Sequence, residues 1–169
     1  MMARAALHHR GVTLVELMIG LAIAATLASL ALPSFSGYLQ RQRLKAVATM
    51  MDTDLREARF EATRRGQAMH LVYQTGPDWC YALATEAGCD CRVASACRLK
   101  TVRAQDVRSV QLLQAQSVRF DPSSGRTEAA VNTSTWGVPH GERLQVSVNA
   151  MGRPAVCVAD GNLPPFTSC

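Results

Sequence analysis

One long apolar run dominates the start of the chain. Residues 17–40 carry no charged side chain, and Leu17–Leu32 are almost entirely Leu, Ile, Ala and Met. With the apolar residues just before it, the run reaches about the 20 residues that cross a bilayer as a helix. A soluble core helix of this length would show a polar face. We therefore expect residues 12–39 to form the membrane-spanning half of a helix.

The apolar pattern then changes to that of an amphipathic helix. Apolar residues recur at spacings of three and four, which predicts that residues 40–66 continue the helix with one face against a globular head. Asp52 and Arg56 form an i,i+4 pair on the other side, as do Glu61 and Arg65. The residues of the apolar stripe are Leu44, Val47, Met51, Leu55, Ala58 and Ala62.

Residues 67–169 show the short-period pattern of strands. Gly66 fits the left-handed position that ends many helices. The fold class that follows is α+β, with an antiparallel β-sheet head over the second half of the helix. The strand-like stretches are residues 67–74, 117–122 and 143–158, the last as two strands around a turn at Met151–Gly152. Residues 85–98 are loop-like, and residues 128–141 are rich in turn formers.

The leader before the apolar run differs from an ordinary secretory signal. Residues 1–11 (MMARAALHHRG) are short and basic, with no acidic residue. A secretory signal has its small-residue cleavage site after the apolar stretch, whereas here the small residue Gly11 precedes it. Glu16 adds a carboxylate near the start of the run. Such an acid is costly in a membrane unless it lies at the interface or is paired.

These features together resemble a type IV pilin signal of the class III type. In such signals the leader ends in Gly, Glu is the fifth mature residue, and a helix-kinking proline follows. Here Gly11, Glu16 and Pro33 fall in register, although Val12 stands where Phe is usual. The resemblance implies that a prepilin peptidase cuts after Gly11 and methylates the Val12 amine. It also implies that Glu16 pairs with the N-terminal amine of a neighbouring subunit.

The charge distribution is mildly basic. The formal net charge is +5, and two of the basic residues lie in the leader, so the mature chain carries about +3. This is far from the charge density of a dedicated nucleic-acid binder. Arg41, Arg43 and Lys45 follow the apolar run, so the count of flanking charges does not place the N-terminus inside. The resemblance to a pilin signal instead implies that the N-terminus lies inside and the head in the periplasm.

The head resembles the FimT/GspH family of minor pilins and type II secretion pseudopilins. The matching stretches are LREARFEATRRGQAMHL, VRFDPSSGRTEA and LQVSVNAMGRPAVCV. The family implies a scarce subunit that initiates or caps a pilus, or that lies near the tip of a secretion pseudopilus. The implied partners are the prepilin peptidase, other pilin or pseudopilin subunits and the inner membrane.

The cysteine count indicates three disulfide bonds. All six cysteines follow the apolar run, on the side that would face an oxidising periplasm. Fifteen pairings are possible. Pilin heads imply a bridge between the last two, and the other four would pair among themselves, with 89–91 disfavoured by geometry. The cysteines are Cys80, Cys89, Cys91, Cys97, Cys157 and Cys169.

Two alternative functions remain open. FimT-type minor pilins can bind DNA through a Gly-Arg-x-Arg motif, and Gly152 and Arg153 match its start, but Ala155 replaces the second arginine. Arg143 or Arg126 could compensate only by folding nearby. The other alternative is a signal-anchored periplasmic redox or metal protein that uses the cysteine cluster. No zinc spacing, C-x-x-C or catalytic motif is present, so we expect neither an enzyme nor a cofactor.

Overall fold

The computed structural model describes residues 13–139 and 141–169, and residues 30–34 by their backbone alone. The chain divides into two compact units that meet between Tyr38 and Leu39. The predicted cleavage site, Gly11 and Val12, lies outside the described residues.

A single helix, α1 (Leu14–Arg65), belongs to both units. The helix continues without a break through Pro33, so the proline kink stays a prediction. The large apolar side chains of its residues 14–29 and 35–38 are solvent-exposed. Among the described residues, no helix is both long and apolar enough to cross a membrane.

The second half of α1 carries the predicted apolar stripe into the core. All six predicted stripe residues are buried, from Leu44 to Ala62. The two predicted ion pairs are present on the other side, Asp52 with Arg56 and Glu61 with Arg65. Gly66, with a φ of 62°, follows the last helical residue. The periodic sequence pattern therefore specified this half of the helix.

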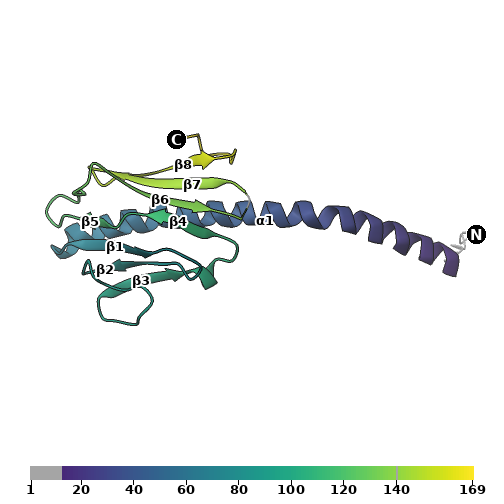
Figure 1. The fold of residues 1–169 in the computed structure, drawn as a ribbon, viewed down its shortest axis with the longest axis horizontal. Helices are drawn as coiled ribbons and strands as arrows, with labels where there is room; N and C mark the ends of the chain where they lie inside the picture. The colour runs from purple at the N-terminus through teal and green to yellow at the C-terminus, as the bar shows by residue number, and fades with distance from the viewer. Residues whose placement is uncertain (1–12, 140) are drawn as a thin grey trace, which may run out of the picture. The chain divides into compact units, whose positions relative to one another are not determined.

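The head holds two four-stranded antiparallel sheets rather than the single sheet expected from the sequence. Figure 1 shows β1–β3 on one side of the second half of α1 and β6–β8 on the other. The sheet orders are β3-β2-β1-β5 and β4-β6-β7-β8, and one apolar core joins both sheets to α1. The strands are β1 (Met69–Gln74), β2 (Cys80–Ala84), β3 (Arg98–Arg103), β4 (Gln111–Ala115), β5 (Val118–Phe120), β6 (Val131–Gly137), β7 (Arg143–Asn149) and β8 (Pro154–Asp160).

Strand β6 lies within residues 128–141, the segment that is rich in turn formers. It is central in its sheet, between β4 and β7. Its buried Ser134 is hydrogen-bonded, because the Trp136 Nε1–H donates to Ser134 Oγ at 3.0 Å. Trp136 also packs edge-on against Trp79, with ring centroids 5.0 Å apart. These contacts anchor the second sheet in the common core.

A buried carboxylate links α1 to the first sheet. Asp54 is 1% exposed, and its Oδ2 accepts a hydrogen bond from the Tyr81 hydroxyl at 2.8 Å. Lys100 on β3 donates to Oδ1 of the same carboxylate. Burial, together with the Asp54 charge, raises the pKa of the Tyr81 hydroxyl well above its usual range. The helix is thus fixed against β2 and β3 by directional contacts as well as by apolar packing.

Candidate functional site

Glu16 lies in the first turn of α1, with its side chain exposed. Its backbone N–H donates to Thr13 Oγ1 at 3.2 Å, so the Thr13 side chain caps the N-terminus of the helix. Within residues 13–139 and 141–169, no ion pair involves Glu16.

The six cysteines form three disulfide bonds, Cys80–Cys91, Cys89–Cys97 and Cys157–Cys169. The first two bridges fold residues 85–97, here called the cysteine flap, over one face of the first sheet. Cys80, Ala82 and Ala84 of β2 are buried against this flap. The described chain has no free thiol, so with the bridges intact none of these cysteines offers a thiolate to a metal ion.

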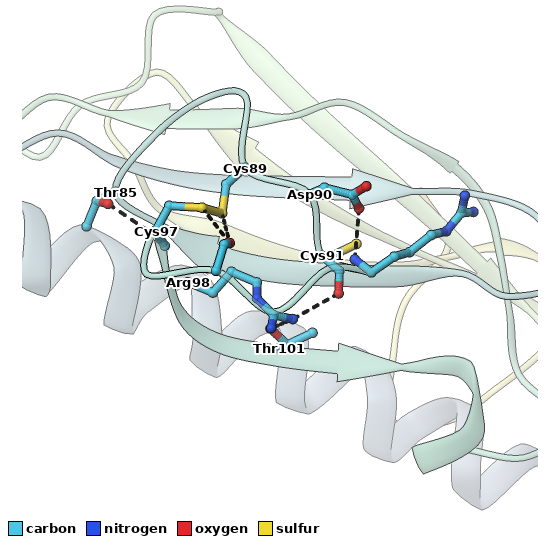
Figure 2. The surroundings of a disulfide bond; sticks show 9 residues. Thr85, Cys89, Asp90, Cys91, Cys97, Arg98 and Thr101 are labelled. Carbon is cyan, nitrogen blue, oxygen red and sulfur yellow. Dashed lines mark hydrogen bonds between the residues drawn. A yellow bond between two sulfur atoms is a disulfide. The ribbon is translucent and has the colours of Figure 1, made fainter.

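Arg98 holds the base of the cysteine flap. Figure 2 shows its guanidinium directed toward Cys91 and Thr101. Its Nη1 donates to the Cys91 carbonyl at 3.1 Å and to Thr101 Oγ1 at 3.2 Å. The Thr85 N–H donates to the Cys97 carbonyl and so joins the first and last residues of the flap. Among the described residues, no group of three His, Cys, Asp or Glu side chains is placed to hold a metal ion.

The third disulfide fixes the C-terminal segment along the edge of β8. The Val158 N–H donates to the Thr167 carbonyl at 2.8 Å, and the Cys169 N–H donates to the Val158 carbonyl at 3.0 Å. The Lys45 ammonium of α1 donates to the Pro164 carbonyl. The segment thereby covers part of a sheet edge that would otherwise expose unpaired backbone groups.

A groove of about 400 Å³ lies between α1 and the turn that joins β7 to β8. We call it the arginine groove because three arginines line it. Phe60, at 61% exposed, adds an aromatic surface to a wall that is otherwise basic and polar. Its lining residues are Arg56, Arg59, Phe60, Thr63, Ser124, Gly152, Arg153 and Pro154.

Two glycines let the loops of the arginine groove approach each other and α1. Gly152 has a φ of 70°, and a Cβ added there would lie 2.3 Å from the Gly125 carbonyl oxygen. A Cβ on Gly125 would lie 3.0 Å from the Arg59 side chain. Hydrogen bonds from Ser123 and Ser124 to Asp121 order the same turn and lower the pKa of that carboxyl to about 2. Glycine is therefore required at these positions for geometric reasons.

The structure places the predicted motif residues Gly152 and Arg153 in the arginine groove. Arg143, one of the two arginines considered as compensation, lines a different hollow with Leu113 and Asp160. The basic side chains that accompany Arg153 are Arg56 and Arg59 of α1. Sequence reasoning missed them because they lie more than 90 positions away from Arg153 along the chain. Their one sequence signal was the arginine-rich helix end.

The comparisons with known proteins agree with this architecture. The family model described as type II transport protein GspH matches residues 48–152, which is more than half of the chain. A prokaryotic N-terminal methylation motif matches residues 7–32. No curated protein sequence is significantly similar to this chain.

Two solved structures of one protein share the fold. Both are crystal forms of the type IV minor pilin FimU of Pseudomonas aeruginosa, at 16% sequence identity. One has a TM-score of 0.54 and covers 70% of this chain, and the other has a TM-score of 0.51 and covers 67%; each match covers 91% of FimU. At this identity the likeness supports the pilin fold of the head.

Proposed function

This chain belongs to the GspH family of type II transport proteins, and from that premise we propose that it is a scarce filament subunit that acts by assembly. It is a pilin or pseudopilin subunit with an N-terminal methylation motif. Its finer role would be to initiate or cap a type IV pilus or a type II secretion pseudopilus. A prepilin peptidase would cut after Gly11 and methylate Val12, leaving α1 to anchor the head on the periplasmic side of the inner membrane.

The exposed apolar part of α1 is the observation that carries this proposal. Within residues 14–29 and 35–39 large apolar side chains are exposed, whereas the apolar stripe of the second half, from Leu44 to Ala62, lies in the core. A contiguous exposed apolar surface of this size requires a partner. Lipid before assembly and the helices of neighbouring subunits afterwards would both cover it. The core of the head has no need of these residues, so their role is intermolecular.

Glu16 would set the register of this assembly. An unpaired carboxylate inside a membrane costs about 2.5–3.5 kcal/mol, and pairing with the Val12 amine of a neighbouring subunit would offset that cost. The corresponding change in an assembly equilibrium is roughly a hundred-fold. We expect Glu16→Ala and the isosteric Glu16→Gln to insert in the membrane normally but to be lost from purified filaments.

Quantitative immunoblotting of sheared filaments and of the membrane fraction measures this effect. Glu86→Ala, which removes an exposed glutamate of the cysteine flap, serves as the matched control and should enter filaments like the wild type. Wild-type incorporation of Glu16→Gln would show that the charge of Glu16 has no role in assembly.

DNA binding for transformation is a second candidate function, and the arginine groove favours it. Arg153 would supply one phosphate contact, and Arg56 and Arg59 of α1 line the same groove. Arg56 also contacts Asp52 at 2.8 Å, which reduces its net contribution. Exposed Phe60 offers a face on which an unpaired base could stack. The groove therefore combines the two features that sequence-tolerant nucleic-acid sites use.

Fluorescence anisotropy with a labelled oligonucleotide, measured over a series of salt concentrations, tests this candidate on the detergent-solubilised chain. Arg153→Ala should weaken binding and reduce the slope of log affinity against log salt by about one. Arg92→Ala removes an exposed arginine from the cysteine flap and should leave the slope unchanged. Equal effects of the two substitutions would indicate diffuse attraction and exclude a site in this groove.

A further inference from the structure

The end of the head at which α1 enters it gathers basic side chains from separate parts of the chain. Arg41, Arg43 and Lys45 lie on α1 itself. The segment between β3 and β4 brings Arg108 to Arg43, and the two line a hollow of about 260 Å³. We call these four residues the basic collar. The sequence shows three of its members, and the fold adds the fourth.

The acidic groups at this end only partly compensate the basic collar. Glu142 contacts Arg41 at 2.7 Å, and Asp106 shares the hollow with Arg43 and Arg108. The Asp106 carboxylate also accepts a hydrogen bond from the Arg103 backbone N–H at 2.8 Å. Within the described chain, no carboxylate forms an ion pair with Arg43 or Arg108. Both side chains are exposed.

The order of residues along α1 is that of a helix crossing from lipid into water. The exposed apolar residues come first, then the exposed aromatics Phe35 and Tyr38, then the collar. Aromatic side chains favour the level of the lipid headgroups, and Lys and Arg extend toward the phosphates. Arg41 follows Tyr38 by less than one helical turn, a rise of about 4.5 Å.

We infer that the basic collar docks the head on an anionic phospholipid surface before the subunit enters a filament. Arg43 and Arg108 would bind lipid phosphates directly, and Lys45 would add charge beside them. The Arg41–Glu142 contact would hold the adjacent β6–β7 loop against α1. This inference rests on the membrane anchoring proposed above. Docking would limit the orientations of the head and present a defined side of it to the next subunit.

The test uses the full chain reconstituted in vesicles of phosphatidylcholine alone and of phosphatidylcholine with phosphatidylglycerol. Flotation reports anchoring, and amide hydrogen exchange of residues 104–110 reports contact between the head and the lipid surface. We expect flotation with both compositions, and exchange of this segment slowed about five-fold or more by phosphatidylglycerol, an effect that high salt removes.

A charge-matched pair of variants locates the contact. Arg43→Gln with Arg108→Gln should abolish the slowing by phosphatidylglycerol, whereas Arg126→Gln with Arg153→Gln, at the opposite end of the head, should preserve it. If both double variants lose protection equally, net charge alone is responsible and the collar is not a site.

Different results would overturn membrane anchoring and lipid binding by the basic collar. Flotation with both compositions, but identical exchange of residues 104–110, would overturn the collar and leave the anchoring intact. Absence of flotation with either composition would overturn the anchoring, and the collar with it.

Discussion

Replacing Gly152 by alanine should destabilise the head by an amount that the geometry of the turn allows us to work out. The φ of 70° is left-handed, which costs a residue with a Cβ about 1–2 kcal/mol. The new methyl group would also lie 2.3 Å from the Gly125 carbonyl oxygen, closer than real Cβ contacts. Because that oxygen belongs to backbone, one of the two turns must move, and the total loss should be about 2–4 kcal/mol.

Gly66 provides a control with nearly the same backbone conformation. Its φ is 62°, but a Cβ there would meet no atom within 4 Å. Gly66→Ala should therefore cost only the conformational part, about 1–2 kcal/mol. The difference between the two variants isolates the close approach of the two turns.

Urea unfolding with the disulfides intact measures both losses. The edge-on pair of Trp79 and Trp136 should give a near-ultraviolet circular dichroism signal that reports the common core. Equal unfolding free energies for Gly152→Ala and Gly66→Ala would refute the reasoning, because the contact with Gly125 would then contribute nothing.

Three further changes test other parts of the head. Replacing Cys157 and Cys169 together by serine should cost about 3 kcal/mol in calorimetry, and an unchanged melting temperature would show that the C-terminal bridge is dispensable. Above about pH 10 the free energy of unfolding should fall as pH rises, because the pKa of the Tyr81 hydroxyl is raised in the folded chain and the unfolded chain therefore loses that proton first. Urea titrations that give the same unfolding free energy at every pH in that range would contradict this. Lys100→Ala should lower the free energy of unfolding by about 1–2 kcal/mol, a value discounted because the Lys100 side chain is 41% exposed. The same substitution in a chain that already carries Asp54→Asn should cost less, and an equal cost would show that the two side chains are not coupled.

The helix and the paired strands near the C-terminus could be predicted because their patterns are local. The stripe from Leu44 to Ala62 repeats at the helical period, and every member is buried. The turn at Gly152 separates two alternating stretches that became β7 and β8. Local periodicity is decided by near neighbours along the chain, so a single sequence contains it.

Strand β2 could not be predicted because both of its faces are covered. Tyr81 and Leu83 face the common core, while Cys80, Ala82 and Ala84 lie beneath the cysteine flap. Burial on both faces removes the alternation of apolar and polar residues that marks a half-exposed strand. The flap itself depends on which cysteines pair, and the spacing left that choice open.

The residues that form each candidate site could likewise be predicted only in part. Gly152 and Arg153 could be singled out by their motif, but their neighbours Arg56 and Arg59 come from α1, which the fold alone brings to the groove. Arg108 joins Arg43 for the same reason. Charged surfaces assembled from distant segments carry no periodic signal, so they become visible only when the topology is known.

Mass spectrometry of the N-terminal peptide of the membrane-extracted protein tests the central claim most directly. The proposed assembly requires the leader to be removed, because in it the Val12 amine would pair with Glu16 of a neighbouring subunit. The account predicts a chain that begins at Val12 and carries a methyl group on its amine. A chain that retains MMARAALHHRG, in cells with an active prepilin peptidase, would contradict it.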